Sequence, residues 1–496
     1  MSAAGPQRVR RLNMQQGFTH TIDGKGEGSA ASFEVINPAT GVAFALCPDA
    51  THEQLDRAVA AARRAFVAWR KLPLQQRCDA LRAFGAAVRT RVDEIAVLLT
   101  REQGKPLQRA KEEVLRALVN LDGILATRLE TEVVRDDARG RAELQHHPLG
   151  VIGAITPWNV PVLLAMPKIA QALVTGNAIV LKPSPYTPLT TLLLGEIARE
   201  HFPPGVVNIL AGGNAFGGWM TEHPGIDKIS FTGSVATGKR VMASAAATLK
   251  RVTLELGGND AAIVLDDVDV KAIAPKLFWA SFGNSGQICQ AIKRLYVHDA
   301  VYDELCAALV AIAGTVKVGE GFEDGVLIGP VQNRMQYERV LELLADTKRQ
   351  PGVRILCGGD ALPRPGYFIA PTIVADIAEG TRLVDEEPFG PVLPVIRFHD
   401  VDDAIRRAND SRFGLAGSVW SADEARAKAA AEQLEVGTAW VNHHLGVEPD
   451  LPFGGFKESG IGREYGADGL RHYSEIRVVS RPIIPARPAV GQGAKA

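Results

Sequence analysis

Apolar and polar residues alternate along this chain with two different periods. Between residues 54 and 129 the apolar positions recur every three or four residues, which predicts amphipathic helices; one such series is Ala58, Ala62, Ala65, Phe66 and Trp69. From residue 149 the pattern changes to apolar runs of four or five residues, which predict buried strands at 151–155, 178–181, 206–210, 228–231 and 251–254.

Helical stretches separate these runs. One is expected at 167–174, ending at Gly176 and Asn177, and another from Pro188 to about residue 201, with Thr187 as its N-cap. A second series follows, with strands at 261–265 and 294–297 and helices at 271–282 and 301–313. Strands that alternate with helices predict an α/β fold with parallel sheets covered on both faces.

The ends of the chain have a different character. Residues 1–30 and the Pro/Gly-rich tail from about residue 481 are expected to be loosely ordered. Residues 472–479 predict an exposed strand, which needs a partner edge. We place a domain boundary near residues 256–259, between the two α/β series.

Length and composition narrow the class of protein. A chain of 496 residues predicts two or three domains, and 46% hydrophobic with 22% charged residues is typical of a soluble globular protein. The formal net charge of −1 favours neither nucleic acid nor an anionic membrane as a partner. The five cysteines form no Cys-x-x-Cys pair, and there is no signal-like or membrane-spanning apolar stretch, so we expect a cytoplasmic protein.

Cys289 is the first candidate for chemistry. It follows Ser285-Gly-Gln-Ile, a loop-like stretch in which Gly286 is costly inside regular structure. A thiolate at such a turn is a nucleophile, provided that its pKa is lowered or a base is supplied. An arbitrary cysteine is more often a small core residue, which is our interpretation of Cys306.

Two further residues follow predicted strands. Glu255, in Thr253-Leu-Glu-Leu-Gly-Gly, is flanked by leucines that would desolvate it and raise its pKa toward that of a general base; the alternative is a carboxylate that points to solvent. Asn159, in Thr156-Pro-Trp-Asn-Val-Pro, lies in a loop fixed by two prolines, and its amide suits an oxyanion hole. The alternative there is ordinary turn chemistry.

The glycine-rich segments carry weaker signals. Phe231-Thr-Gly-Ser follows a strand and opens a helix, so Ser234 lies where phosphate binds a helix N-terminus, or is simply a helix cap. The standard dinucleotide fingerprint is absent. Neighbouring histidines such as His443 and His444 point to opposite faces of a strand, and no metal site is predicted.

Taken together, these segments resemble the aldehyde dehydrogenase superfamily. The likeness runs from about residue 33 to residue 479. Its motifs occur in the family's order: Pro-Trp-Asn at 157–159, Lys-Pro-Ser at 182–184, Phe-Thr-Gly-Ser at 231–234, Glu-Leu-Gly-Gly at 255–258, Gly-Gln-x-Cys at 286–289, Glu-Glu-Pro-Phe-Gly-Pro at 386–391 and Pro-Phe-Gly-Gly-x-Lys-x-Ser-Gly at 452–460.

The resemblance implies a mechanism. Cys289 would attack the aldehyde carbon, and the Asn159 side chain with the backbone N–H of Cys289 would bind the oxyanion. Oxidation would leave a thioester, and Glu255 would activate the water that hydrolyses it. Lys168 and Glu464 would lie nearby and help to move protons.

The resemblance also implies a nicotinamide cofactor, NAD or NADP. Its binding residues would be Ile155, Thr156, Pro157, Trp158, Lys182, Ser184, Gly213, Gly233, Ser234, Thr237, Leu256, Glu387 and Phe389. Members that prefer NAD commonly carry a Glu three residues after the position of Lys182, where this chain has Pro185. A Glu there would repel the 2′-phosphate of NADP. In its absence Lys182 could pair with that phosphate, so NADP is a candidate cofactor.

The family's domains map onto this chain as three units. Residues 1–129 and 149–256 would form a Rossmann-type cofactor domain, residues 257–465 an α/β catalytic domain, and residues 130–148 with 466–496 a small β oligomerisation unit. A homodimer or homotetramer follows by analogy.

The substrate is predicted only as a small-molecule aldehyde. Its pocket would include Val160, Ile288, Gln290, His443, Val447 and Phe453, and aliphatic, aromatic and semialdehyde substrates remain open. Two other interpretations keep the fold: a CoA-acylating semialdehyde dehydrogenase and a non-catalytic protein. Glu255 argues against the first, since acylating relatives usually lack this base. The joint presence of Cys289, Glu255 and Asn159 argues against the second.

Overall fold

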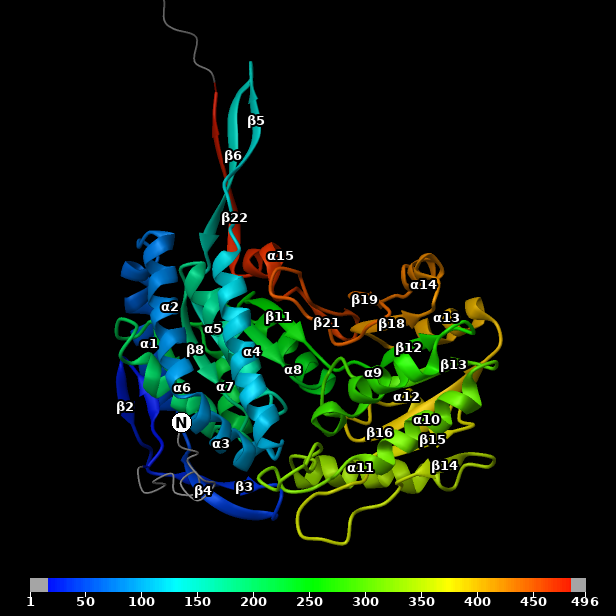
Figure 1. Cartoon of the computed structure of the whole chain (residues 1–496). Coiled ribbons are helices and arrows are strands. Elements are labelled where there is room, and N and C mark those ends of the chain that lie inside the picture. Colours follow the sequence, from blue (N-terminus) through cyan, green and yellow to red (C-terminus); the bar gives the residue numbers. More distant parts are fainter. Residues whose placement is uncertain (1–16, 483–496) are drawn as a thin grey trace, which may run out of the picture.

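The computed structural model describes residues 17–482 and contains two large sheets and one small one (Figure 1). The first large sheet has eight strands, of which the central five are parallel. In spatial order they are β2 (Lys25–Glu27), β1 (His20–Ile22), β9 (Val207–Ile209), β8 (Ala178–Lys182), β7 (Val151–Ile155), β10 (Lys228–Thr232), β11 (Arg251–Glu255) and β21 (Gly460–Ile461).

Helices cover both faces of this sheet. One face packs against α1 (His52–Trp69), α7 (Asn214–Glu222) and α8 (Val235–Ala246). The other packs against α5 (Pro161–Val174) and α6 (Leu189–Ala198), with α2 (Leu74–Thr90), α3 (Val92–Gln103) and α4 (Leu107–Ala126) outside them. Neighbouring residues of β7 enter different cores, Val151 one and Ile152 the other. A strand buried on both faces reads as a continuous apolar run.

The second large sheet has seven strands. In order they are β14 (Arg354–Cys357), β15 (Thr372–Ala375), β16 (Val392–Phe398), β13 (Ile292–His298), β12 (Asp260–Val264), β18 (Ala416–Trp420) and β19 (Thr438–Val441), all parallel except β14. One core contains residues of α9 (Val270–Phe282) and α10 (Tyr302–Thr315). The other contains residues of α11 (Arg334–Thr347), α12 (Arg382–Asp385), α13 (Val401–Asn409) and α14 (Glu424–Ala431). The predicted α/β class with covered parallel sheets is confirmed.

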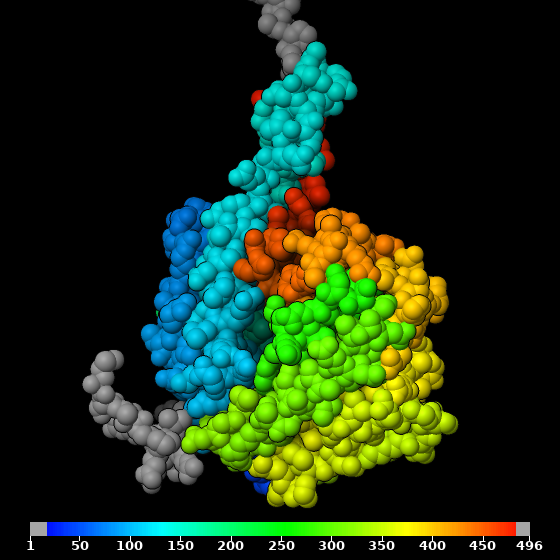
Figure 2. Space-filling view, turned by 45° about the vertical axis from the view of Figure 1, so that its right-hand side comes forward, coloured from blue at the N-terminus to red at the C-terminus, as the bar shows by residue number. Residues whose placement is uncertain are grey.

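The small sheet projects from the body of the molecule (Figure 1). Its order is β22 (Ser474–Arg481), β6 (Gly140–Pro148) and β5 (Glu132–Asp137), and it follows α15 (Gly466–Arg471). The predicted late strand therefore exists and pairs antiparallel with β6, with Ile476 opposite His146. In the space-filling view the sheet stands above a hollowed seam between the blue-to-cyan lobe and the green-to-yellow lobe (Figure 2).

The remaining strands form two short ribbons, β3 (Ser32–Asn37) with β4 (Val42–Pro48) and β17 (Phe413–Gly414) with β20 (Phe456–Lys457). Within residues 17–482, none of the helices is long and apolar enough to cross a bilayer.

Three details of the sequence prediction were wrong. Residues 20–27 are not loosely ordered but form β1 and β2, because Thr21 pairs with Ile209 at the sheet edge. Helix α5 begins at Pro161 rather than at Pro167, since the buried Glu113 carboxylate accepts the N–H of Val162 (3.0 Å). The predicted loose tail falls mostly outside the described residues.

The third error concerns the start of α6. Thr187 makes no capping bond, and the helix begins at Leu189. The buried Glu102 on α3 accepts the backbone N–H groups of Leu189 (2.7 Å) and Thr190 (3.0 Å) instead. A carboxylate from another helix therefore replaces the local cap that the sequence pattern favoured.

The boundary predicted near residues 256–259 coincides with the change of sheet, because β11 ends at Glu255 and β12 begins at Asp260. One short segment crosses it: β21 lies in the stretch assigned to the catalytic domain and pairs with β11 of the first sheet.

Replacing Glu102 with alanine tests the tertiary cap. The change leaves buried N–H groups of α6 without an acceptor, so we expect the free energy of unfolding to fall by about 2–4 kcal/mol. Thermal and urea unfolding measure the loss. Glu112→Ala, which removes an exposed ion pair with Arg109, is the matched control and should change stability by less than about 0.5 kcal/mol. Equal effects of the two changes would contradict the cap.

Candidate active site

Cys289 lies on a turn of unusual backbone conformation. The turn follows the short 3-10 segment η1 (Gly283–Gly286), where Asn284, Ser285 and Gly286 have φ values of 51°, 59° and 71°. A Cβ atom at Gly286 would lie 2.1 Å from the carbonyl oxygen of Gly390. Glycine is therefore required in Gly-Gln-x-Cys, because the turn packs directly on the end of the Glu-Glu-Pro-Phe-Gly-Pro segment.

Asn159 is held beside this turn from both sides. Its Nδ2 donates to the carbonyl of Gln287 (3.0 Å), two residues before Cys289. Its own carbonyl accepts from Lys105 Nζ (3.0 Å) and from Asn284 Nδ2 (3.0 Å). The carboxamide is consequently a fixed donor next to the cysteine, as an oxyanion hole requires.

Glu255 is a buried carboxylate at the carboxyl end of β11. Its Oε1 has no hydrogen-bond partner among the described residues. Burial raises the pKa of Glu255 well above its usual range, and the charge of Glu464 raises it further, while Lys168 opposes the shift. The desolvation expected from the flanking leucines is present, and the side chain does not point to solvent. The raised pKa makes the ionised Glu255 carboxylate a stronger base than an exposed carboxylate, so it is suited to take a proton from a neighbouring group.

The glycines of the motif at 452–460 explain why Glu255 is enclosed. A Cβ atom at Gly454 would lie 2.8 Å from Glu255 Oε1, so that segment closes over the carboxylate. Lys168 on α5 and Glu464 form a buried ion pair. Ser230 on β10 accepts from Lys168 (2.9 Å) and donates to Glu464 (3.1 Å). The structure thus places the predicted proton-moving pair under the same sheet as Glu255.

The surroundings of Cys289 disfavour its charged form. Burial raises the pKa of the Cys289 thiol to about 12, and the carboxylates of Glu255, Asp260 and Glu387 raise it further, whereas Lys293 lowers it. In this arrangement the thiol keeps its proton at neutral pH. A nucleophilic role therefore needs a base, and Glu255 is the buried carboxylate at hand.

The residues predicted to bind a nicotinamide cofactor gather at the carboxyl ends of the first sheet. Lys182 ends β8; its Nζ donates to the Pro183 carbonyl (3.0 Å), and burial lowers the pKa of Lys182 to about 8. Ser234 caps α8 by accepting the N–H of Thr237 (3.3 Å), and the space around the Cβ position of Gly213 is open. Open backbone and a helix start beside a lysine fit the phosphates of a dinucleotide.

The other residues of that set line the same region. The hydroxyl of Thr156 is buried and has no hydrogen-bond partner in the part of the chain that the structure describes, so it is available to a ligand. The Trp158 and Phe389 rings meet edge to face at 5.3 Å. Most of the remainder lie on strand ends or on the turns that follow them: Ile155, Pro157, Ser184, Gly233 and Leu256. Glu387 lies between α12 and β16. The residues present therefore fit the cofactor that the resemblance implies.

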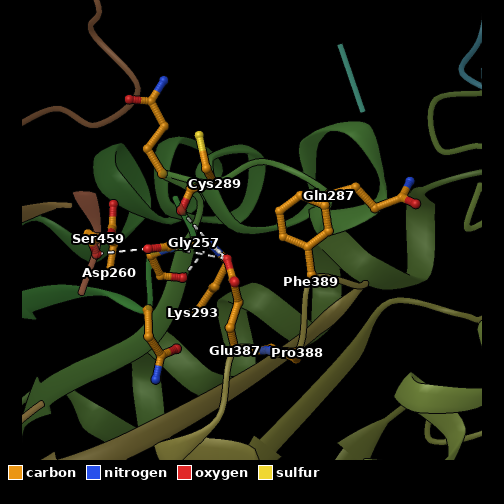
Figure 3. A network of polar contacts seen from close by, with 12 residues as sticks. Gly257, Asp260, Gln287, Cys289, Lys293, Glu387, Pro388, Phe389 and Ser459 are labelled. Atoms are coloured by element: carbon orange, nitrogen blue, oxygen red, sulfur yellow. Dashed lines mark hydrogen bonds and ion pairs between the residues drawn. The ribbon is translucent and has the colours of Figure 1, made fainter. Parts of the chain in front are cut away.

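Figure 3 shows how Glu387 reaches the turn of Cys289. Its Oε1 accepts from the backbone N–H of Gly258 (3.2 Å) and pairs with Lys293 (3.0 Å). A Cβ atom at Gly257 would lie 2.3 Å from its Oε2. The two glycines of Glu-Leu-Gly-Gly are required here because the carboxylate and the Cys289 turn approach the backbone closely.

The aldehyde dehydrogenase family model matches residues 25–479. An aldehyde dehydrogenase of Fusarium sp. is 40% identical over 93% of this chain and 98% of its own length. A phenylacetaldehyde dehydrogenase of Pseudomonas fluorescens is 39% identical over 90% of this chain and 92% of its own. The solved NAD+ complex of a Bacillus cereus aldehyde dehydrogenase is 35% identical, with a TM-score of 0.92, and covers 95% of this chain and 98% of its own.

The chain belongs to the aldehyde dehydrogenase family.

Family membership confirms the predicted fold and reaction class, the oxidation of an aldehyde with a nicotinamide cofactor. The roles of single residues stay predictions. Of the predicted substrate residues, Val447 packs against the apolar core that contains Phe453, and Gln290 carries a buried side-chain oxygen that has no hydrogen-bond partner within residues 17–482. Val160 precedes α5, and Ile288 lies on the Cys289 turn.

The expectation that His443 and His444 lie on one strand is wrong, because β19 ends at Val441 and both residues follow it. His443 is exposed and its Nδ1 contacts the carbonyl of Val441 (2.9 Å). His444 points the other way, and its Nε2 contacts the carbonyl of Gln290 (2.8 Å). Burial lowers the pKa of His444 to about 3, so its ring is neutral where it supports the Cys289 turn. The prediction that His443 lines the substrate pocket is not tested by this arrangement.

Sequence reasoning missed the buried charges that hold the site together. Lys105 and Glu113 form a buried ion pair that supports Asn159 and the start of α5. Asp260 and Lys293 lie beside the Cys289 turn. The signal was present for the last two, because Asp260 opens an apolar strand and Lys293 interrupts one.

Replacing Gly286 with alanine tests the close approach at the turn. The substitution forces a side chain into positive φ and against the Gly390 carbonyl, so we expect kcat to fall at least about tenfold and stability to fall by about 1–3 kcal/mol. Steady-state kinetics and thermal unfolding measure both effects. Gly314→Ala on α10, where nothing lies within 4 Å of the added Cβ, is the control and should be neutral or stabilising. An active and stable Gly286→Ala enzyme would contradict the argument.

Proposed function

We propose that this protein oxidises an aldehyde to a carboxylic acid through a thioester on Cys289, with Glu255 as the base that releases the product. The observation that carries the proposal is the enclosed Glu255 carboxylate, buried, without a partner for Oε1 and close enough to influence the Cys289 thiol.

The chemistry begins at the sulfur. Cys289 Sγ gives its proton to Glu255 and bonds to the aldehyde carbon, and the carbonyl electron pair moves onto oxygen. Asn159 Nδ2 and the backbone N–H of Cys289 bind that oxyanion. Asn159 would then exchange its bond to the Gln287 carbonyl for one to the substrate. The nicotinamide supplies the acceptor for the hydride that leaves the same carbon.

Release of the acid depends on the carboxylates. Glu255 first gives up the proton that it took from Cys289 and then takes a proton from water, whose oxygen attacks the thioester carbon. Cys289 leaves as the thiolate and takes this second proton from Glu255. The Lys168–Glu464 pair passes the surplus proton away from Glu255. A CoA-acylating enzyme would need no such base, and this favours hydrolysis over acyl transfer to coenzyme A.

Glu255→Gln tests the hydrolytic step. We expect a slowed first turnover, because the Cys289 thiol loses its proton acceptor, that still reaches about one reduced nicotinamide per site, followed by a steady-state rate lower by about 10²-fold or more. Rapid-mixing absorbance measures both phases. In the native enzyme the steady-state rate should rise with pH, because Glu255 accepts a proton only above its raised pKa, and this rise should vanish in the variant.

The matched control is Cys289→Ser, which should lose the first turnover as well as the steady state. Acceleration by coenzyme A, with formation of acyl-CoA, would instead support the acylating alternative. A full steady-state rate in Glu255→Gln would contradict the proposed base.

Cofactor choice is proposed to depend on two positions near Lys182. Pro185 is half-buried and brings no carboxylate to the ribose, which leaves NADP admissible beside NAD. Asp49 keeps a negative charge in the region: its Oδ1 accepts the N–H of Gly213 (3.3 Å), and it raises the pKa of Lys182 against the effect of burial. A 2′-phosphate beside Asp49 would be repelled.

Asp49→Asn therefore should shift the preference toward NADP. We expect kcat/KM with NADP to rise about tenfold relative to NAD, which corresponds to a free-energy difference of ~1.4 kcal/mol. Measuring both cofactors with one aldehyde gives the ratio. Asp79→Asn, which alters an exposed pair with Arg82, is the control. An unchanged ratio would contradict the proposed effect of Asp49 on cofactor choice. No turnover of the native enzyme with NADP would contradict the proposed effect of Pro185.

The assembly is proposed to be a homodimer or homotetramer. β22 forms an edge of the small sheet, with the apolar side chains of Ile476, Val478 and Val479 exposed. A projecting edge with such side chains suits pairing with a second copy. Residues 130–148 and 466–482 would form this unit, beside a cofactor domain and a catalytic domain built on the two large sheets.

We further propose a cytoplasmic location and an aldehyde without phosphate as substrate. The five cysteines are all free, as in a reducing compartment, although one relative is named as chloroplastic and another as mitochondrial. Two similar enzymes are named for phenylacetaldehyde, which is aromatic, and for betaine aldehyde, which is cationic. Aromatic aldehydes are the first class to test, because one of these similar enzymes is named for phenylacetaldehyde.

A further inference from the structure

Lys293 is a buried lysine at the start of β13, four residues after Cys289. It is 2% exposed and lies in a strand whose other residues are almost all buried. An ammonium group in such a place is costly unless its three N–H donors find acceptors. Its contacts therefore indicate what it stabilises.

The Lys293 ammonium meets three oxygens from three separate segments (Figure 3). Nζ donates to the carbonyl of Cys289 (2.5 Å) and to the carbonyl of Gly258 (2.9 Å), and it pairs with Glu387 Oε1 (3.0 Å). It also lies 5.6 Å from the centre of the Phe389 ring. One side chain thus joins the nucleophile turn, the link between the large sheets and the Glu387 segment.

The charges around Cys289 make this contact consequential. Glu255 on β11, Asp260 on β12 and Glu387 before β16 all disfavour a thiolate, and the neutral His444 after β19 supplies no compensating charge. Lys293 is the cation that acts in the opposite sense. Its side chain lies beneath the turn, while the Cys289 sulfur points away from the polar network (Figure 3).

We propose that Lys293 is a positioning residue that fixes the Cys289 carbonyl against Gly258 and Glu387, and that its charge favours the thiolate of Cys289. The inference builds on the proposed role of Cys289 as nucleophile. It adds a residue that none of the sequence motifs contains.

Variants of Lys293 can separate the effect of its charge on Cys289 from the effect of its packing. Lys293→Met keeps the length and apolar stem of the side chain but removes the ammonium, whereas Lys293→Arg keeps a cation with several donors. Lys250→Met is the matched control, since Lys250 is also buried and donates to a backbone carbonyl, that of His223 (2.8 Å), away from Cys289.

The experiment measures alkylation of Cys289 by iodoacetamide between pH 6 and 10 in the full-length protein without cofactor, with the labelled residue identified by mass spectrometry. We expect Lys293→Met to alkylate about tenfold more slowly at pH 7, as one unit of thiol pKa gives, and Lys293→Arg to recover most of the rate. Lys250→Met should match the native protein. A native rate in Lys293→Met, or an equal loss in both Lys293 variants, would overturn the inference.

Glu387→Gln gives a second test that leaves Lys293 in place. It removes a negative charge near the thiol and leaves the ammonium less neutralised, so alkylation should become faster, the opposite of Lys293→Met. If Lys293→Met does not fold, an unchanged or slower rate in Glu387→Gln overturns the inference. The outcome is distinct from that of the proposed function, which fails if Cys289→Ser retains aldehyde oxidation, whatever the alkylation rates are.

Discussion

The four residues from Leu256 to Asn259 are the only chain between β11 of the first large sheet and β12 of the second. Because the link is so short, the last residue of one sheet and the first of the other lie beside the same turn. Its two glycines allow the close approach: a Cβ at Gly258 would lie 2.6 Å from the Cys289 carbonyl oxygen. The approach of Glu255, Cys289 and the Glu387 segment to one another depends on this contact between backbones.

Burying so many ionisable groups at one place sets the electrostatics of the site. Desolvation raises the pKa of Glu255 and of Cys289, and it raises the pKa of Asp260 to about 8. These shifts make the ionised Glu255 carboxylate a stronger base, but they also oppose the thiolate. The buried cations Lys168 and Lys293 lie where they offset part of that cost, one beneath Glu255 and one beneath the cysteine turn.

The helices show how tertiary contacts replace local signals. The start of α6 is capped by Glu102 and the start of α5 by Glu113, both from helices earlier in the chain. Neither carboxylate belongs to a local capping pattern, and the predicted cap at Thr187 is not used. A buried side chain from afar can satisfy the same N–H groups that a neighbouring Ser or Thr would satisfy at the surface. Such pairings depend on the packing of α3, α4, α5 and α6 and leave no fixed spacing in the sequence.

The sequence by itself determined the fold class, the positions of the strands at 151–155, 178–181, 228–231 and 251–254, the change of sheet after Glu255, and the selection of Cys289, Glu255 and Asn159 as candidates for the chemistry. It did so because burial on both faces of a parallel strand produces continuous apolar runs, and because close backbone approaches demand glycine at fixed places beside reactive residues. Only the tertiary structure decided which charges face that chemistry. Lys105, Glu113, Asp260 and Lys293 come from separate elements, and their effect on the site depends on distances and burial that arise only after the two sheets have packed together.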